Sequence, residues 1–164
     1  MNEKWIVYNK KADFYRLSEQ FHIDPVIARV IRNRDIVSPE EFERYLGDDG
    51  SLYDPHSMKD MDKGVQLIQN AIIEQKRIRI ISDYDVDGIM SNYILYQGLL
   101  RCNAQVDYRI PDRITDGYGM NENMVREAYD AGVEVLLTCD NGIAALLPIA
   151  YAKNLGMTVV VTDH

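Results

Sequence analysis

Residues 77–91 read "RIRIISDYDVDGIMS" and contain the clearest structural signal in the chain. Its β-branched start predicts a short buried strand, and the apolar spacing after Gly88 predicts a helix. Between the two lie three aspartates at alternate positions, Asp83, Asp85 and Asp87. The stretch therefore predicts a strand, an acidic turn and a helix in immediate succession.

The chain from Lys59 onward repeats this alternation of strands and helices. Strands separated by helices of ten or more residues form right-handed βαβ units around a parallel sheet. We therefore expect an α/β fold over residues 59–164, an open parallel sheet with helices on both faces. The expected strands cover residues 77–82, 104–110, 133–138 and 157–162, and the expected helices cover residues 59–76, 88–102, 122–131 and 142–156.

Residues 1–58 have a different pattern, which predicts a small helical region packed on the sheet domain. Three short segments read as helices, at residues 13–23, 25–34 and 38–46. The third begins with Ser38 as N-cap and has Glu41 three residues later, which is a capping-box arrangement.

Composition excludes several classes of protein. The chain has 164 residues, a net charge of −8 and only two cysteines, Cys102 and Cys139, which have neither CxxC nor CxxH spacing. This argues against a zinc knuckle or a disulfide framework and favours a reducing, cytoplasmic setting. The longest apolar run, residues 143–150, is too short to span a membrane. The acidity counts against a general nucleic-acid coat, but bound divalent cations can invert the local charge.

Polar residues follow every expected strand. The carboxyl ends of parallel strands meet at the edge where open α/β sheets bind ligands, so we expect these residues to converge. They are the three aspartates of the first turn, the stretch "PDRITDGYG" (residues 111–119), Asp140 with Asn141, and Asp163 with His164.

Carboxylates brought together at one edge repel one another. Two unit charges about 4 Å apart cost roughly 4 kcal/mol at an effective dielectric near 20. No lysine lies in these turns, and Arg113 is the one arginine there. Hard cations such as Mg²⁺ or Mn²⁺ would stabilise the cluster, and two of them could clamp the attacking and leaving oxygens of a phosphate ester.

Two other interpretations of the acidic turn fail on the sequence. An EF-hand loop that starts at Asp83 needs a bidentate Glu at its twelfth position, where the chain has Ile94, and its first flank is strand-like. A haloacid-dehalogenase-type phosphatase needs Thr after D-x-D-G, where the chain has Ile89. A solvated turn that caps the next helix remains a simpler alternative.

The motifs together resemble the DHH phosphoesterase superfamily. "DYDVDG" (residues 83–88), "CDNGI" (139–143) and "TDH" (162–164) resemble its motifs I, II and III, the last cut after its first histidine. The stretches at residues 54–72 and 110–119 resemble the RecJ-like branch, which comprises single-strand-specific DNA exonucleases. The resemblance implies 5′→3′ hydrolysis of single-stranded DNA in repair or recombination, with two Mn²⁺ or Mg²⁺ ions as cofactors.

The resemblance also implies roles for the acidic residues. Asp85 and Asp87 would each bind one metal ion, and Asp83 would be a weaker ligand or lie behind the ligands. Asp140 would bridge the two ions, and His164 would bind one ion or the scissile phosphate. Asp163 would orient that histidine. As alternatives, Asp140 could be a helix N-cap and His164 a frayed terminus.

The loop after the second strand is the expected substrate side of the site. Arg113 is a candidate phosphate contact, although it could instead neutralise nearby carboxylates. We expect four further residues to shape this loop: Asp116, Gly117, Tyr118 and Gly119. Tyr118 could stack on a base or pack locally. The implied partners are single-stranded DNA and, with it, a helicase or a single-strand-binding protein.

Because the third motif stops after one histidine, we expect the chain to be cut within its catalytic domain and inactive alone. One alternative is another DHH phosphodiesterase that acts on short oligonucleotides or nucleotide signals. A binding module that has lost catalysis and acts as a replication scaffold is a second alternative. Retention of the acidic residues and the terminal histidine speaks against it: Asp85, Asp87, Asp140, Asp163 and His164.

Overall fold

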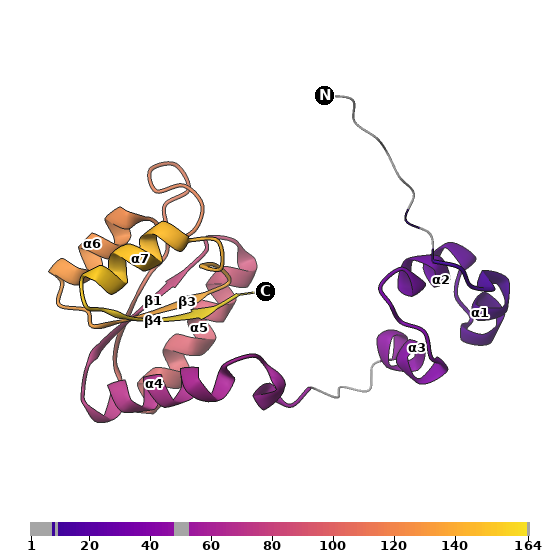
Figure 1. Cartoon of the computed structure of the whole chain (residues 1–164), viewed down its shortest axis with the longest axis horizontal. Coiled ribbons are helices and arrows are strands. Elements are labelled where there is room, and N and C mark those ends of the chain that lie inside the picture. The colour runs from indigo at the N-terminus through magenta and orange to yellow at the C-terminus, as the bar shows by residue number, and fades with distance from the viewer. Residues whose placement is uncertain (1–7, 9, 48–52, 164) are drawn as a thin grey trace. The chain divides into compact units, whose positions relative to one another are not determined.

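A computed structural model of the chain describes residue 8 and residues 10–47 and 53–163. It divides the chain into two compact units, Met1–Tyr53 and Asp54–His164, and each is described here by itself (Figure 1). None of the helices in the described ranges has the length and apolar character needed to cross a membrane.

The described residues of the first unit form three short helices, α1 (Phe14–Phe21), α2 (Pro25–Arg32) and α3 (Pro39–Leu46). Each begins at a polar cap, and the predicted capping box of α3 is confirmed, with the Ser38 and Glu41 side chains bonded to each other's backbone N–H. The unit buries Ala28, Ile31 and Phe42. The Phe42 ring stacks on Phe21 with centroids 4.9 Å apart.

The second unit is the predicted α/β fold. Four parallel strands pair in the order β2-β1-β3-β4, which confirms the parallel sheet. In chain order the elements are η1 (Pro55–Ser57), α4 (Met61–Ile73), β1 (Arg77–Ser82), α5 (Val86–Arg101), β2 (Gln105–Arg109), α6 (Glu122–Asp130), β3 (Val135–Cys139), α7 (Leu146–Asn154) and β4 (Thr158–Thr162).

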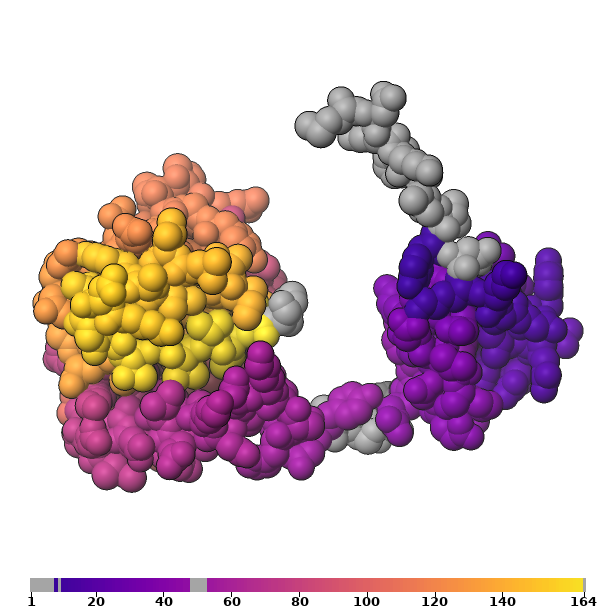
Figure 2. Space-filling model, in the orientation of Figure 1, coloured from indigo at the N-terminus to yellow at the C-terminus, as the bar shows by residue number. Residues whose placement is uncertain are grey.

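Helices cover both faces of this sheet, so the core has two layers. Ile78 and Ile80 of β1 pack with residues of α4 and α5, whereas Ile81 packs with residues of α6 and α7. In Figure 1, α6 and α7 lie on one side of the strands and α4 and α5 on the other. In the space-filling view, the yellow C-terminal residues lie between the orange and magenta parts of the unit (Figure 2).

The strand order places the switch point of the sheet between β1 and β3. The chain leaves β1 toward α5 on one face, and it leaves β3 toward α7 on the opposite face. In open α/β sheets, ligands bind outside the carboxyl ends of the strands at such a point. Asp83 directly follows β1 and Asp140 directly follows β3, so these two aspartates flank the switch point.

The last helix begins later than the sequence predicts, at Leu146 instead of Gly142. A helix that began at Gly142 would have Pro148 in its interior, where proline cannot donate the backbone hydrogen bond. Starting at Leu146 puts Pro148 in the first turn, where its missing N–H costs nothing. The Ile143 N–H is instead bonded to the Asp163 carboxylate, at 2.8 Å.

Candidate metal centre at the carboxyl edge of the sheet

Asp83 is the unusual residue of the site, because its carboxylate is completely buried. Its exposed fraction is 0%, and neither Oδ1 nor Oδ2 has a hydrogen-bond partner among the described residues. A buried carboxylate without partners is strongly unfavourable unless a cation compensates its charge. The Asp83 side chain therefore fits a bound cation, and its two hard oxygen atoms suit Mg²⁺ or Mn²⁺.

The turn after Asp83 folds back tightly at Gly88. A Cβ at Gly88 would lie 2.4 Å from the carbonyl oxygen of Asp83, so only glycine fits there. The Asp85 carboxylate accepts the Gly88 N–H at 3.0 Å and caps α5. Asp85 and Asp87 are both exposed. The capping role predicted as the simpler alternative is thus real for Asp85, and it leaves the predicted metal role untested.

Asp140 lies at the end of β3 in a strained backbone conformation. Its φ is 56°, in the left-handed region that residues other than glycine rarely adopt. Its N–H donates to the Thr162 carbonyl at 3.1 Å, which extends the pairing of β3 with β4. Such strain clusters at functional sites when surrounding contacts hold the residue in place. Asp140 is half-buried and is well placed beside the switch point.

The residue after Asp140 joins the two central strands. The Asn141 amide donates to the Ile81 carbonyl at 3.0 Å and to the Cys139 carbonyl at 3.3 Å. Its Oδ1 is buried and has no hydrogen-bond partner in the described part of the chain. The sequence shows Asn141 among the polar strand-end residues but gives no sign of this contact, which bridges 60 residues.

The neighbouring cysteine takes no part in the chemistry. Cys139 is 2% exposed, and burial, followed by the charge of Asp140, raises the pKa of its thiol to about 11. A thiol with this pKa is protonated at neutral pH, so Cys139 is neither a nucleophile nor a good metal ligand.

The end of β4 connects back to the turn after Asp140. The Asp163 carboxylate accepts the Ile143 N–H at 2.8 Å, so it holds this turn against the last strand. His164 lies outside the described residues. Its predicted metal role, and the role of Asp163 in orienting it, stay predictions.

Tyr118 brings the loop after β2 into electrostatic contact with the acidic edge. The charge of Asp83, then burial, then the charge of Asp140 raise the pKa of the Tyr118 hydroxyl, and its approach to Asp83 and the charge of Asp85 add to the shift. The Tyr118 hydroxyl and the Asp83 carboxylate nevertheless stop short of a formed hydrogen bond. The Tyr118 ring is 73% exposed and packs edge-on against Tyr84, with centroids 6.1 Å apart. The loop after β2 and the acidic turn after β1 thus lie side by side at this edge of the sheet, and their union in one substrate site stays a prediction.

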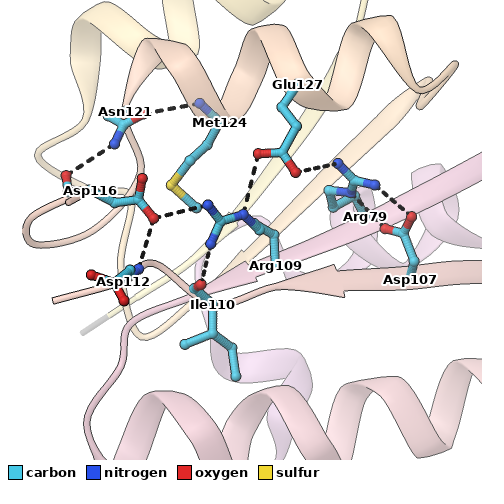
Figure 3. Close-up of polar contacts among 9 residues, drawn as sticks. All are labelled: Arg79, Asp107, Arg109, Ile110, Asp112, Asp116, Asn121, Met124 and Glu127. Atoms are coloured by element: carbon cyan, nitrogen blue, oxygen red, sulfur yellow. Dashed lines mark hydrogen bonds and ion pairs between the residues drawn. The ribbon is translucent and has the colours of Figure 1, made fainter. Parts of the chain in front are cut away.

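The other residues predicted on this loop differ in whether they face solvent or the protein. The exposed Arg113 places its guanidinium 5.5 Å from the centre of the Tyr84 ring. In contrast, the Asp116 carboxylate turns inward and accepts hydrogen bonds from Arg109 at 2.9 Å and from the Asp112 N–H at 2.8 Å (Figure 3). Gly117 has a positive φ of 78°, and Gly119 is buried.

The acidic side chains share one edge without closing around a common point. Within residues 10–47 and 53–163, no three His, Cys, Asp or Glu side chains gather closely enough to hold a metal ion. The sheet topology places the predicted ligands that the structure describes at the same edge, but their side chains do not surround a common point. Coordination of a metal ion by Asp83, Asp85, Asp87 and Asp140 stays a prediction. The orphaned Asp83 carboxylate is the observation that fits a cation here.

Comparison with known proteins gives a consistent result. A family model described as "DHH family, N-terminal domain" matches residues 77–164. The single-stranded-DNA-specific exonuclease RecJ of Bacillus subtilis is 37% identical over 163 residues, which are 98% of this chain and 21% of that protein. The protein of the same name from Escherichia coli is 32% identical over 144 residues, 87% of this chain and 24% of the relative.

Solved structures show the same similarity. An exonuclease RecJ bound to manganese matches with a TM-score of 0.64 at 33% identity, over 69% of this chain and 29% of the other. RecJ in complex with Mn²⁺ from Thermus thermophilus matches with a TM-score of 0.61 at 26% identity, over 92% of this chain and 20% of the other. The chain also spans only 21% and 24% of the length of the two curated relatives described above.

Proposed function

Since the chain belongs to the DHH family, we propose that it carries the acidic half of the active site of a single-strand-specific DNA exonuclease that depends on Mn²⁺ or Mg²⁺. The observation that carries this proposal is the Asp83 carboxylate, completely buried and without a hydrogen-bond partner in the described residues. The relatives named for single-stranded DNA, and the related structures with bound manganese, support it.

In this proposal the strand ends hold two divalent ions. Asp83, Asp85 and Asp87 would supply oxygen ligands from the turn after β1, Asp140 would supply them from the end of β3, and His164 would be a further ligand. Bound ions of this kind polarise the phosphate and lower the pKa of an attacking water. The carboxylates of the chain hold the ions in place, and Asp163 orients His164.

The loop after β2 supplies the substrate contacts. Arg113 is exposed beside Tyr84, so its guanidinium can meet a phosphate group. The exposed ring of Tyr118 stands by the acidic edge, where it can stack on a base of a single strand. Gly117 and Gly119, which both have a positive φ, let the backbone of this loop turn on either side of Tyr118. Asp116 shapes the loop from inside.

The setting follows from the same proposal. Both cysteines are free, which agrees with a reducing cytoplasm. An exonuclease specific for single strands depends on other proteins to expose its substrate. We therefore infer that a helicase or a single-strand-binding protein acts beside it in DNA repair or recombination.

Metal binding by the 164-residue chain is the first test. Titration calorimetry with Mn²⁺ should show binding that Asp83→Asn and Asp140→Ala abolish, whereas Asp62→Asn, which alters an exposed aspartate of α4, should leave it unchanged. Mn²⁺ binding by Asp83→Asn with wild-type affinity would overturn the proposal.

The reaction is tested separately, in the setting of a full-length relative, because the chain spans 21% of the length of the Bacillus subtilis protein. In a chimaera, this chain replaces the matching 163 residues of the Bacillus subtilis relative. The chimaera should degrade end-labelled single-stranded DNA from its 5′ end with Mn²⁺, should leave duplex DNA intact, and should lose activity with Asp140→Ala. Cleavage restricted to di- to tetranucleotides would instead assign the site to a phosphodiesterase of short oligonucleotides.

A further inference from the structure

Two arginines and three carboxylates form a continuous row beneath α6. We call this row the arginine–carboxylate ladder, and it is drawn in Figure 3. Its members come from β1, β2, α6 and the loop after β2: Arg79, Asp107, Arg109, Glu127 and Asp116.

The two ends of the ladder connect different elements: one joins two strands, and the other joins a strand to the loop after β2. At one end Arg79 donates two hydrogen bonds to Asp107, both 2.7 Å long, between the neighbouring strands β1 and β2. At the other end Arg109 donates to Asp116 at 2.9 Å. Glu127 lies between the arginines, 3.9 Å from Arg79 and 3.3 Å from Arg109. Only the second end reaches the substrate-side loop.

We propose that Arg109 is a positioning residue for substrate binding: through Asp116 it fixes the loop of residues 111–119, and so holds Arg113 and Tyr118 beside the acidic edge. This role rests on the proposed function. It adds to the proposed site a residue that supports substrate binding without contacting the substrate. Neither the strand pattern nor the motifs single out Arg109.

The hydrogen bonds around Asp116 show how the loop is held. One oxygen, Oδ2, accepts both the Arg109 guanidinium and the Asp112 N–H, which closes the loop on itself. The Asp116 carbonyl accepts the Asn121 amide at 3.1 Å, and Asn121 in turn caps α6 through the Met124 N–H. The loop is thus fixed to the end of β2 on one side and to the start of α6 on the other.

The setting of Arg109 suits a permanent anchor and not a substrate contact. Its side chain is 30% exposed and that of Asp116 is 16% exposed. Burial lowers the pKa of the Arg109 guanidinium, but the neighbouring Glu127 and Asp116 outweigh this effect, and the net pKa is raised. Its donors are directed at Glu127, Asp116 and the Ile110 carbonyl, whereas the Arg113 side chain is exposed.

The test compares the two ends of the ladder in the 164-residue chain. Asp116→Asn and Arg109→Gln break the loop end, and Asp107→Asn is the matched control that breaks the strand end. Hydrogen exchange of the amides at residues 112–119 should become about tenfold faster in the first two variants and stay within about twofold in the control, since a tenfold change corresponds to about 1.4 kcal/mol. Mn²⁺ affinity should stay within about twofold in all three.

Binding is then measured with a 5′-phosphorylated oligo(dT) whose linkages are phosphorothioates, in the presence of Mn²⁺. Asp116→Asn and Arg109→Gln should raise its Kd about tenfold, a loss of about 1.4 kcal/mol. Arg109→Lys, which keeps the charge beside Asp116, should restore the Kd to within about threefold of wild type. Asp107→Asn should leave it unchanged.

The possible failures are distinguishable. If Asp116→Asn binds the oligonucleotide as tightly as wild type, or if Asp107→Asn weakens binding equally, the positioning role is wrong and the proposed function stands. If the wild-type chain binds Mn²⁺ but not the oligonucleotide, the proposed substrate falls and the positioning role falls with it.

Discussion

Two loops at the same edge of the sheet use aspartate in opposite ways. In the turn between β1 and α5, the carboxylate of Asp83 is buried and no described residue forms a hydrogen bond to it. In the loop between β2 and α6, Asp116 accepts two hydrogen bonds, and Asp112 accepts the N–H groups of Ile114 and Thr115, both at 2.9 Å. The buried carboxylate of the first loop thus fits a cation from outside the chain, whereas the carboxylates of the second loop accept hydrogen bonds from neighbouring groups of the chain itself.

Pairing within the protein separates the acidic residues that can bind a cation from those that support the fold. A carboxylate that accepts hydrogen bonds within its own loop stabilises that loop. A buried carboxylate without a hydrogen-bond partner fits a bound cation, which would compensate its charge. On this criterion we propose Asp83 for the metal centre, and Asp112 and Asp116 for the scaffold of the loop that carries Arg113 and Tyr118.

The largest effect is expected from Gly88→Ala, in the first turn of α5, where the helix packs against the first loop. The new Cβ would lie 2.4 Å from the Asp83 carbonyl oxygen, a backbone atom that cannot move without opening the turn. We expect a loss of about 3 kcal/mol in the free energy of unfolding, as in severe overpacking, measured by urea denaturation. The matched control is Gly98→Ala in the same helix, where a Cβ meets nothing within 4 Å. That change should stabilise the chain by roughly 1 kcal/mol, and equal losses in both variants would contradict the prediction.

The second effect concerns the unpaired carboxylate itself. Mn²⁺ at about a hundred times its Kd should stabilise the wild-type chain by about 2.7 kcal/mol, which thermal unfolding measures. Asp83→Asn removes the buried charge, so it should raise the stability of the metal-free chain and abolish the gain from Mn²⁺. Asp112→Asn, in the second loop, should keep that gain. A metal-free Asp83→Asn chain less stable than wild type would show that the carboxylate is satisfied within the protein.

The sequence predicts much of this contrast, but it does not say which aspartates point inward. The β-branched runs predict the strands. The alternation of strands and helices along the chain predicts the edge of the sheet where the polar residues meet. Alternation alone would put Asp83, Asp85 and Asp87 on one face, yet the chain leaves the strand at Ser82 and only Asp83 stays buried. Burial here depends on the tight turn at Gly88, which is a property of packing.

The second loop shows the same limit for contacts between distant elements. The stretch "PDRITDGYG" predicts a loop on the substrate side, and the exposed Arg113 and Tyr118 agree with that. The inward turn of Asp116 depends on Arg109 at the end of β2, whose position is fixed by pairing with β1. The local sequence around Asp116 does not indicate that Arg109 is its hydrogen-bond partner.

A smaller effect is expected from Gly117→Ala in the second loop. A Cβ at Gly117 meets nothing within 4 Å, so its φ of 78° is the only source of strain. We expect a loss of roughly 1–2 kcal/mol in the free energy of unfolding and no change in Mn²⁺ affinity. Calorimetry with Mn²⁺ on this variant separates the two loops. A loss of Mn²⁺ binding as complete as that expected for Asp83→Asn would mean that the second loop also builds the metal centre.

The smallest effect is a pH dependence confined to the second loop. The backbone N–H groups of Thr115 and Ile114 lower the pKa of Asp112 below its ordinary value of 3.8. Because the pKa is lower in the folded chain, the stabilisation of this loop is complete above the ordinary pKa of 3.8 and is lost as the pH falls through the folded pKa. The amide NMR signals of Ile114 and Thr115 should therefore shift with a midpoint below 3.8, and Asp112→Asn should remove the shift. A midpoint at or above 3.8 would mean that the loop does not bond its own carboxylate, and the contrast with Asp83 would then lose its second half.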